Sequence, residues 1–393
     1  MVTPTATAPY DPITAQYRDT LFREARYLNP DELTQLEKAC AFAFRAHDGQ
    51  TRKSGEPYIT HPIAVATNLA CWRMDIQALS AGLMHDVLED TPIIKAQIAE
   101  QFGESIAEMV DGLSKLKNLK YDNKIEQQAE SFRKLILAMT KDVRVIIVKL
   151  SDRLHNMQTL GAKSPASRHR IATETLEVYA PIANRLGLNH VYRELQDLAF
   201  QAVHPKRYAV LQHAMTAFKK NRHDVIERVL HEISLHLVGH NIEAQIRGRE
   251  KNLYNIHQKM LTKKLKFEEV LDIYGFRVIV NSVDQCYLAL GALHALYQPK
   301  PGKFKDYIAI PKSNGYKSLH TTLNGPYGLP IEVQIRTRKM HQVAEVGIAS
   351  HWAYKSGENH EDEATLRTNQ WLQNILDLQA HSDNAIEFLE HVK

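Results

Sequence analysis

Four ionisable side chains in the first quarter of the sequence are of the types that bind metal ions and move protons. His85 and Glu89 are four residues apart, as are Asp86 and Asp90. In a helix this spacing places all four on neighbouring parts of one face. Imidazole and carboxylate groups can hold a metal that lowers the pKa of a bound water, and a carboxylate that is not a ligand can take the proton. The pattern predicts metal-assisted hydrolysis.

Such a metal site needs further ligands from other parts of the chain. Asp152, His47 and His61 are the candidates, and spacing alone does not choose between the two histidines. Mixed nitrogen and oxygen ligands favour manganese, iron or zinc over a metal that prefers thiolates. The alternative is an acidic helix surface with unrelated histidines, because the chain contains 20 His.

A second group of candidates is basic and lies later in the chain. Residues 247–320 contain 13 basic and 6 acidic side chains, whereas residues 31–108 contain 6 basic and 12 acidic ones. Cations and helix N-termini bind phosphate, and an aromatic ring such as Tyr316 can stack on a base. Asp272 and Glu332, on neighbouring predicted strands, could hold Mg²⁺ against a triphosphate. These residues leave RNA binding and nucleotide transfer equally open, and no Walker-type loop is present.

The elements that position these residues change in character along the chain. Apolar residues recur at helical spacing from about residue 30 to 202, and alternation typical of strands follows later. We predict strands at 242–246, 274–280, 307–310 and 331–335, and helices at 252–264, 284–297, 338–354 and 364–391. The predicted class is α+β multidomain, an all-α domain followed by a small mixed α/β domain with one sheet and C-terminal helices. The predicted borders are 1–202 for the all-α domain, 203–237 for a helical connector, 238–356 for the α/β domain and 357–393 for a C-terminal helix.

Composition excludes several classes of protein. The 393 residues are 44% hydrophobic and 24% charged with a formal net charge of +4, which argues against a disordered, collagen-like or disulfide-scaffold chain. Cys40, Cys71 and Cys286 form no CxxC motif, so we expect reduced thiols. Neither an apolar stretch of about 20 residues nor a signal-peptide pattern is present. We therefore expect a cytoplasmic protein that does not contact a membrane.

Three ordered motifs make the first half recognisable. Residues 52–58 with His61-Pro62, then 85–90, then 152–157, closely resemble the hydrolase domain of the RelA/SpoT homologues, HD-type enzymes that make and destroy the alarmones ppGpp and pppGpp. The resemblance is to the N-terminal catalytic region of the long bifunctional, SpoT-like members. It implies one Mn²⁺ held by His61, His85, Asp86 and Asp152. It further implies water activation by Glu89 and Asp90, substrate binding by Arg52, Lys53, Asn156 and Thr159, and a structural part for His47.

The second half resembles the synthetase domain of the same family, which is nucleotidyltransferase-like. The motifs are Gly248-Arg249 with Lys251, Asp272 with Arg277, the Lys-Asp-Tyr at 305–307, residues 314–322 and residues 332–337. The resemblance implies transfer of pyrophosphate from ATP to the 3′-hydroxyl of GDP or GTP. Arg249 and Arg277 would then enclose adenine, Lys251, Lys259 and His320 would contact phosphates, Lys305 would bind substrate, and Tyr316 would stack on guanine. Asp272 and Glu332 would bind Mg²⁺, and Glu332 would also take the hydroxyl proton.

The synthetase half departs from the family pattern at a few positions. Gly275 replaces a small residue and Lys317 adds a charge beside Tyr316, and glycine weakens strand interiors. We therefore expect hydrolysis to dominate over a weaker synthetase. The resemblance also implies regulatory domains that this chain lacks, with ribosome or regulator contact through them. The alternatives are an HD phosphohydrolase of another nucleotide and a non-catalytic RNA- or ribosome-binding module.

Overall fold

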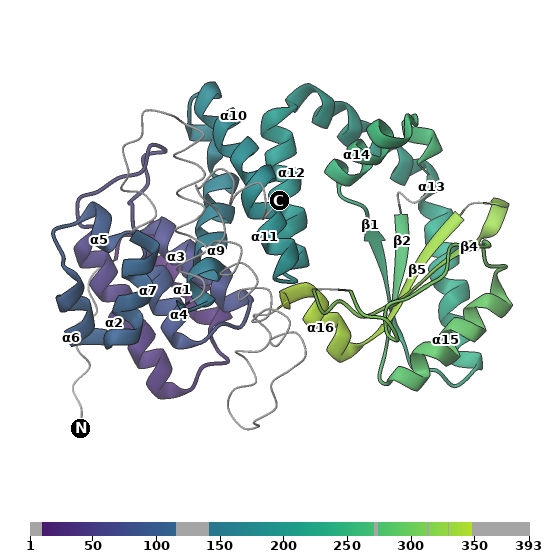
Figure 1. Cartoon of the computed structure of the whole chain (residues 1–393), viewed down its shortest axis with the longest axis horizontal. Coiled ribbons are helices and arrows are strands. Elements are labelled where there is room, and N and C mark those ends of the chain that lie inside the picture. The colour runs from purple at the N-terminus through teal and green to yellow at the C-terminus, as the bar shows by residue number, and fades with distance from the viewer. Residues whose placement is uncertain (1–9, 115–140, 271–273, 313, 329, 348–393) are drawn as a thin grey trace, which may run out of the picture. The chain divides into compact units, whose positions relative to one another are not determined.

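The chain forms two compact units in a computed structural model (Figure 1). The structure describes residues 10–114, 141–270, 274–312, 314–328 and 330–347. The units divide at residue 168, and the second ends at Gly347. The predicted borders of the functional domains, at 202, 237 and 356, stay predictions, because compactness and function need not divide a chain at the same residue.

The first unit is entirely helical in its described part, as the sequence predicts. Its elements are α1 (Pro12–Glu24), α2 (Pro30–Ala46), α3 (Thr60–Cys71), α4 (Ile76–Met84), α5 (Val87–Asp90), α6 (Lys95–Phe102), α7 (Glu104–Ser114), α9 (Arg144–Gln158), the 3₁₀ turn Leu160–Ala162 and the start of α10 (Pro165–Glu174).

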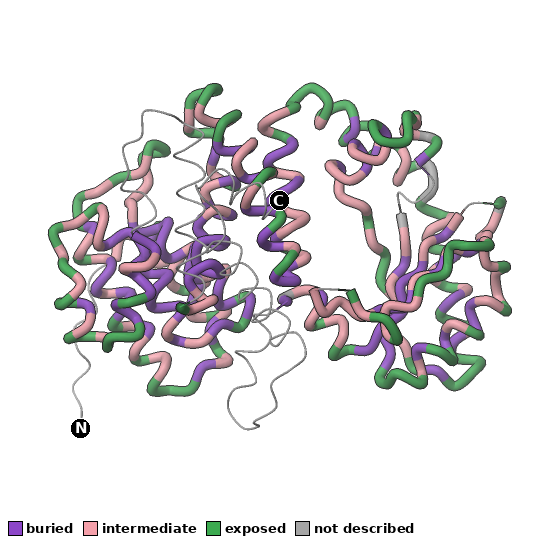
Figure 2. The backbone as a smooth tube through the Cα atoms, in the orientation of Figure 1, coloured by how far each residue is buried: buried purple, intermediate pink, exposed green. Residues whose placement is uncertain are grey.

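Helix α4 forms the centre of this unit. Every α4 residue except Gln77 is buried, and a helix that is apolar on all sides needs neighbours on all sides. Helices α2, α3, α7 and α9 pack around it. Gly82 leaves room for α3, because a Cβ there would lie 2.6 Å from Leu69 Cδ1 of that helix. Buried backbone is concentrated in these helices (Figure 2).

The second unit combines helices with one mixed sheet. After the π-helical segment Thr175–Tyr179 come α11 (Ala180–Arg185), α12 (Asn189–Val203), α13 (Pro205–Gly239), β1 (Gln245–Glu250), α14 (Leu253–Lys263), β2 (Tyr274–Val280), α15 (Val283–Leu296), β3 (Lys305–Asp306), β4 (Leu319–Asn324), β5 (Pro330–Thr337) and α16 (Arg338–Val346). Short 3₁₀ turns lie at Phe267–Glu269 and Pro326–Gly328. The strand order is β1-β2-β5-β4-β3, with β2 and β5 parallel and the other pairs antiparallel.

The two faces of the sheet have different partners, because side chains alternate along a strand. Phe276 and Val278 of β2, with Val333 and Ile335 of β5, belong to an apolar cluster that includes residues of α13 and α15. The intervening residues, among them Arg277 and Glu332, therefore face the opposite side. This alternation places the polar candidates together on the face away from the apolar core.

Several predicted elements differ from the observed ones. The first strand begins at Gln245 instead of Ile242, because Ile242 turns into the core after α13. The strand predicted at 307–310 is wrong, and the short β3 precedes it. Strand β4 was not predicted, since its Thr and Asn residues weaken the pattern. The segment 203–237 is helical as predicted, since α13 covers nearly all of it, while residues 348–354 and the helix at 364–391 lie outside the described residues. No helix of the described chain has the length and apolar character to cross a membrane.

Asp75 joins the start of α4 to the start of α9, and we expect its removal to destabilise the first unit. It caps α4 by accepting from Ala78 N at 2.9 Å, and its other oxygen lies 2.7 Å from Nη1 of Arg144, at the start of α9. We expect Asp75→Ala to lower the free energy of unfolding by about 2 kcal/mol, about 1 from the cap and about 1 from the half-buried charged hydrogen bond. Asn29→Ala, which removes only the α2 cap, should cost about 1 kcal/mol. Equal losses in urea unfolding would contradict the role of Arg144.

Candidate functional site

The first cluster sits where a helix stops. Helix α4 ends at Met84, His85 and Asp86 form a turn, and α5 starts at Val87. Residues 85–90 therefore lie in a helical region, as the spacing suggests, but a turn at His85 and Asp86 interrupts it. The His85 Nδ1 lies 2.8 Å from the Gly82 carbonyl oxygen, which ties the ring back onto the last turn of α4.

Four ligand-type atoms from three helical regions converge in this cluster. His61 lies in the first turn of α3 and Asp152 lies in the middle of α9. The His85 Nε2 is 3.0 Å from Asp86 Oδ2 and 3.8 Å from Asp152 Oδ1, and the His61 Nε2 is 3.3 Å from Asp152 Oδ1 and 3.8 Å from Asp86 Oδ2. His61, His85 and Asp86 satisfy the geometry of a group that can hold a metal ion. The structure thus brings His61, and not His47, into this cluster, as the family resemblance implies and as residue spacing left open.

The outer contacts of both histidines prepare their inner nitrogens for a cation. The contact of His85 Nδ1 with a carbonyl requires a proton on that nitrogen, so the lone pair is on Nε2. The buried His85 Nε2 has no hydrogen-bond partner within the described chain. His61 Nδ1 lies 2.7 Å from Nδ1 of His155. Burial, with the charges of His61 and Arg52, lowers the pKa of His155 to about 3, so its neutral ring can accept the His61 proton. The donor set therefore fits a divalent cation.

Buried charge explains why this cluster is stable and why it attracts a cation. Burial alone would raise the pKa of Asp152, but Lys149 and His61 hold it well below its usual value. The Lys149 Nζ lies 2.7 Å from Asp152 Oδ2, and both side chains are buried. Burial disfavours a charged His85 ring, yet Asp86 and Asp152 outweigh it and raise the pKa of His85. The carboxylates that favour a proton there would also favour a metal ion.

Tyr58 links the cluster to the carboxylates that follow it. Its hydroxyl donates to Asp86 Oδ2 at 2.6 Å and is 3.0 Å from Asp90 Oδ2. Burial and the charge of Asp86 raise the pKa of Tyr58, so the hydroxyl stays protonated. Asp90 is exposed and Glu89 is half-buried on α5. The sequence analysis gave Tyr58 no role. Its position three residues before His61 could have indicated that it lies near the cluster.

A cavity of about 350 Å³ opens next to the four ligand-type atoms. It brings together all four predicted substrate residues, Arg52, Lys53, Asn156 and Thr159, with His61, Asp86 and Asp152. The Arg52 Nη2 donates to Thr159 Oγ1 at 2.9 Å. His47 is buried outside this lining and contacts Gln50 through Nδ1 at 2.9 Å. The cavity joins cationic side chains to a cation-binding cluster, as a phosphorylated substrate of a metal-dependent hydrolase would require.

In the second unit, the strand register arranges polar candidates in two rows across the sheet. Residues directly opposite each other on neighbouring strands point to the same face. The first row contains Arg247, Arg277, Gln334, His320 and Lys305, and the second contains Arg249, Gly275, Glu332 and Thr322. Register therefore unites residues that are far apart in sequence.

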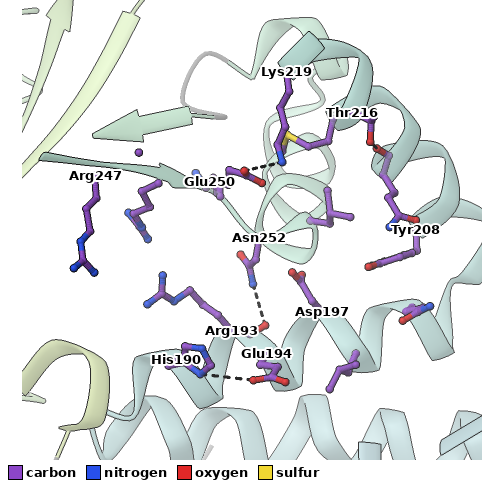
Figure 3. Close-up of a pocket in the computed structure, with 18 of the residues that line it drawn as sticks. His190, Arg193, Glu194, Asp197, Tyr208, Thr216, Lys219, Arg247, Glu250 and Asn252 are labelled. Atoms are coloured by element: carbon purple, nitrogen blue, oxygen red, sulfur yellow. Dashed lines mark hydrogen bonds and ion pairs between the residues drawn. The ribbon is translucent and has the colours of Figure 1, made fainter. Parts of the chain in front are cut away.

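Two cavities of the second unit receive part of these rows. The larger, about 790 Å³, is lined by Arg247, Arg249, Lys251 and Arg277, together with residues of α12 and α13. In Figure 3 the labelled side chains of α12 lie in the lower part of the view, and those of α13 lie from its upper centre to its right side. The smaller, about 270 Å³, is lined by Arg249, Arg277, Tyr316 and His320, among others. Lys259 and Lys305 are not among the described residues that line either cavity.

A carboxylate on α16 holds the arginines of this region. Glu345 Oε1 is 3.1 Å from Arg277 Nη1 and 3.0 Å from Arg336 Nη2, and its Oε2 is 3.7 Å from Arg193 Nη2. Burial alone would raise the pKa of Glu345, but Arg277, Arg193 and Arg336 lower it. Sequence reasoning gave no role to Glu345, Arg193 or Arg336. Of these three, only Glu345 could have been noticed from the sequence, because it follows His341 by four residues, which places both on one face of a helix.

Tyr316, His320 and Glu332 form a chain of polar contacts near the smaller cavity. The Tyr316 hydroxyl is 2.9 Å from His320 Nε2, and His320 Nδ1 is 3.8 Å from Glu332 Oε1. Burial, with the charges of Lys312 and Arg249, lowers the pKa of His320 to about 3, so its ring is neutral. Asp272, the other predicted Mg²⁺ ligand, lies outside the described residues.

The structure gives a steric reason for glycine at position 275, which the sequence did not reveal. A Cβ at this position would lie 2.9 Å from the carbonyl oxygen of Glu332, closer than real Cβ contacts. The glycine therefore allows the close approach of β2 and β5 beside Glu332.

Comparisons with known proteins match both halves of the chain. A family model described as "HD domain" matches residues 39–189, and one described as "Region found in RelA / SpoT proteins" matches residues 248–359. The first match contains the His and Asp cluster, and the second contains the sheet.

Curated relatives carry the names of two opposed activities. The chain is 51% identical over 367 residues to the bifunctional (p)ppGpp synthase/hydrolase SpoT of Escherichia coli, an alignment of 93% of this chain and 52% of that protein. It is 53% identical over 349 residues to the guanosine-3′,5′-bis(diphosphate) 3′-pyrophosphohydrolase of Haemophilus influenzae, covering 88% and 52% respectively. It is 43% identical over 372 residues to the GTP pyrophosphokinase of Myxococcus xanthus, covering 93% and 49%. The chain thus spans about half the length of these relatives.

Tyr58→Phe tests the outer contact of the first cluster. We expect the affinity for Mn²⁺ to fall about 10-fold or more, because outer hydrogen bonds orient ligating carboxylates. The measurement is metal titration of the metal-free protein by calorimetry. Tyr27→Phe is the matched control, since the Tyr27 hydroxyl contacts the Met74 carbonyl of the same unit. Unchanged Mn²⁺ affinity in Tyr58→Phe would show that the Tyr58 hydroxyl does not support metal binding.

The lowered pKa of His320 leads us to predict that the stability of the protein depends on pH. Its folded pKa of about 3 lies below the ordinary value of 6.5, so the unfolded chain binds a proton that the folded chain does not. Stability should therefore fall as pH decreases from about 6.5 towards 3, and His320→Asn should reduce that slope by up to about 1.4 kcal/mol per pH unit. Urea unfolding between pH 4.5 and 7 measures the slope. Replacing the exposed His213 by Asn should leave it unchanged, and identical slopes in all three proteins would refute the prediction.

Proposed function

Because the chain belongs to the RelA/SpoT homologue family, we propose that it carries out two opposed reactions of alarmone metabolism. The first unit removes the 3′-pyrophosphate of ppGpp or pppGpp. The second transfers pyrophosphate from ATP to the 3′-hydroxyl of GDP or GTP. Hydrolysis is the dominant activity of this proposal.

The observation that carries the proposal is the convergence of the nitrogen and oxygen atoms of His61, His85, Asp86 and Asp152 beside a cavity with cationic walls. Bound there, a divalent cation would supply a water of lowered pKa. We propose Mn²⁺, since mixed imidazole and carboxylate ligation suits it.

In the proposed hydrolysis, the water oxygen forms a bond to phosphorus and the bond from that phosphorus to the ribose 3′-oxygen breaks. The products are GDP or GTP and pyrophosphate. Glu89 and Asp90 accept the proton of the water, and Tyr58 holds Asp90 beside the cluster. Arg52, Lys53, Asn156 and Thr159 bind the nucleotide, an assignment supported by their common cavity.

In the proposed transfer, the 3′-oxygen of GDP or GTP bonds to the β-phosphorus of ATP. The bond from that phosphorus to the bridging oxygen of the α-phosphate breaks, and AMP leaves. Glu332 takes the hydroxyl proton and, with Asp272, binds Mg²⁺. Arg249 and Arg277 enclose the adenine, Tyr316 stacks on the guanine, and Lys251, Lys259, Lys305 and His320 bind substrate. Support comes from the shared cavities of Arg249 and Arg277 and from the contact of Glu332 with His320.

We further propose a cytoplasmic location, because the substrates are nucleotides and the described cysteines are free thiols. Contact with the ribosome or another regulator through further domains is proposed on family grounds alone.

Two substitutions should separate the reactions. We expect Asp86→Asn to lower pyrophosphate release from ppGpp by about 100-fold or more while leaving transfer intact, since it removes a ligand-type oxygen. Glu332→Gln should lower pyrophosphate transfer by about 100-fold or more while leaving hydrolysis intact, because general-base groups contribute about 10²–10⁴-fold. Both rates are followed by nucleotide chromatography, with and without EDTA. EDTA should abolish hydrolysis.

Matched controls remove one carboxylate without touching either cluster. Asp19 and Asp224 have side chains that are 75% and 105% exposed, and Asp19→Asn and Asp224→Asn should retain both rates. If folded Asp86→Asn kept full hydrolysis and metal binding, the hydrolase proposal would fail. Full transfer by Glu332→Gln would refute the synthetase proposal.

A further inference from the structure

Arg193 lies in the part of the chain that neither family model covers, between residues 189 and 248. It belongs to α12, and its side chain lines both the larger and the smaller cavity. Arg249 and Arg277 also line both cavities. Three arginines from α12, β1 and β2 therefore share the wall between two spaces that we assign to nucleotides.

The charges around this wall do not balance. Arg193, Arg277 and Arg336 all pair with the single carboxylate of Glu345, and Arg249 lies beside them. Three guanidinium groups thus share one carboxylate, and the described lining of the smaller cavity, which includes all four arginines, contains no carboxylate. Unpaired charge is costly in such a partly buried region. The buried Nε atoms of Arg249, Arg277 and Arg336 have no hydrogen-bond partner within the described chain. An anion with several oxygens would satisfy both deficits.

Of the three arginines that pair with Glu345, Arg193 is the farthest from its carboxylate. Its distance to that carboxylate is 3.7 Å, against 3.1 Å for Arg277 and 3.0 Å for Arg336. Its Nε donates to the Asn189 carbonyl at 2.9 Å, which orients the guanidinium and leaves the Nη atoms for a ligand. In Figure 3 Arg193 extends from α12 into the space that Arg247 also faces. Burial, with the charge of Arg249, lowers the pKa of Arg193, as expected where positive charge is in excess.

We infer that Arg193 is a nucleotide-binding residue of the second site and that its guanidinium binds the phosphate chain of a nucleotide in competition with Glu345. The inference rests on the proposed function of this unit. The ligand class is a polyphosphate, from ATP or from the guanine nucleotide, and the two sources share this chemistry.

The test measures binding to the full chain by calorimetry, with inorganic tripolyphosphate, a non-hydrolysable ATP analogue and GDP as phosphate probes. Adenosine and guanosine are probes of the bases alone. We expect Arg193→Gln to weaken tripolyphosphate and at least one nucleotide about 10-fold, because charged hydrogen bonds to phosphate are strong. Binding of the nucleosides should not change. The nucleotide that weakens identifies the source of the phosphate.

Further variants separate binding from a structural role. Arg193→Lys should recover part of the affinity, since the charge remains while the planar donor pair is lost. Glu345→Gln should strengthen tripolyphosphate binding several-fold, because a competing carboxylate is removed. The control is Arg228→Gln, which removes an exposed arginine paired with Glu232 on α13 and should bind like the wild type.

Each outcome is decisive. Unchanged phosphate binding in Arg193→Gln, or equal losses for nucleosides and phosphates, would overturn the inference and make Arg193 a structural link between α12 and α16. Weaker tripolyphosphate binding in Glu345→Gln would show that Glu345 does not compete with phosphate for Arg193. If the wild-type chain bound neither nucleotide at the second site, the proposed function of that unit would fail instead.

Discussion

Charge that is buried away from water must be compensated, and both candidate sites depend on that constraint. In the first unit, Asp152 is buried in α9 and ionised because Lys149 and the histidines surround it. In the second unit, Arg336 is almost completely buried and relies on Glu345. In each unit the described residues leave some buried polar atoms uncompensated. Among the described residues, a buried imidazole nitrogen of the first unit and several guanidinium nitrogens of the second have no hydrogen-bond partner.

The sign of the remaining charge distinguishes the two clusters chemically. Carboxylates and imidazoles make the first cluster suitable for a cation, while the second has more arginines than carboxylates and is suitable for an anion. An enzyme that cleaves and forms phosphate bonds needs both environments: one to activate water, the other to neutralise a polyphosphate. The proposed pair of reactions therefore agrees with the electrostatics of each unit taken separately.

Backbone geometry determines which side chains can reach these environments. The break between α4 and α5 turns His85 and Asp86 towards α3 and α9, which a continuous helix would not do in the same way. In the sheet, alternation reserves one face of β2 and β5 for the apolar core and leaves Arg277 and Glu332 on the other. The absent side chain at Gly275 allows the two strands to approach beside Glu332. Local backbone features thus control sites built from distant segments.

The sequence by itself determined the two-part architecture, the helical character of the first part, and most of the candidate residues, because helical periodicity and residue chemistry are local properties. It located His85 and Asp86 and named Asp152 as a partner, but it left His47 and His61 as alternatives. The family resemblance favoured His61, but residue spacing could not, since the placement of His61 beside Asp152 depends on how the first turn of α3 meets α9. Arg193 and Glu345 come together only because α12, α16 and the strands β2 and β5 bring three arginines to one carboxylate, and no spacing along the chain encodes those distances.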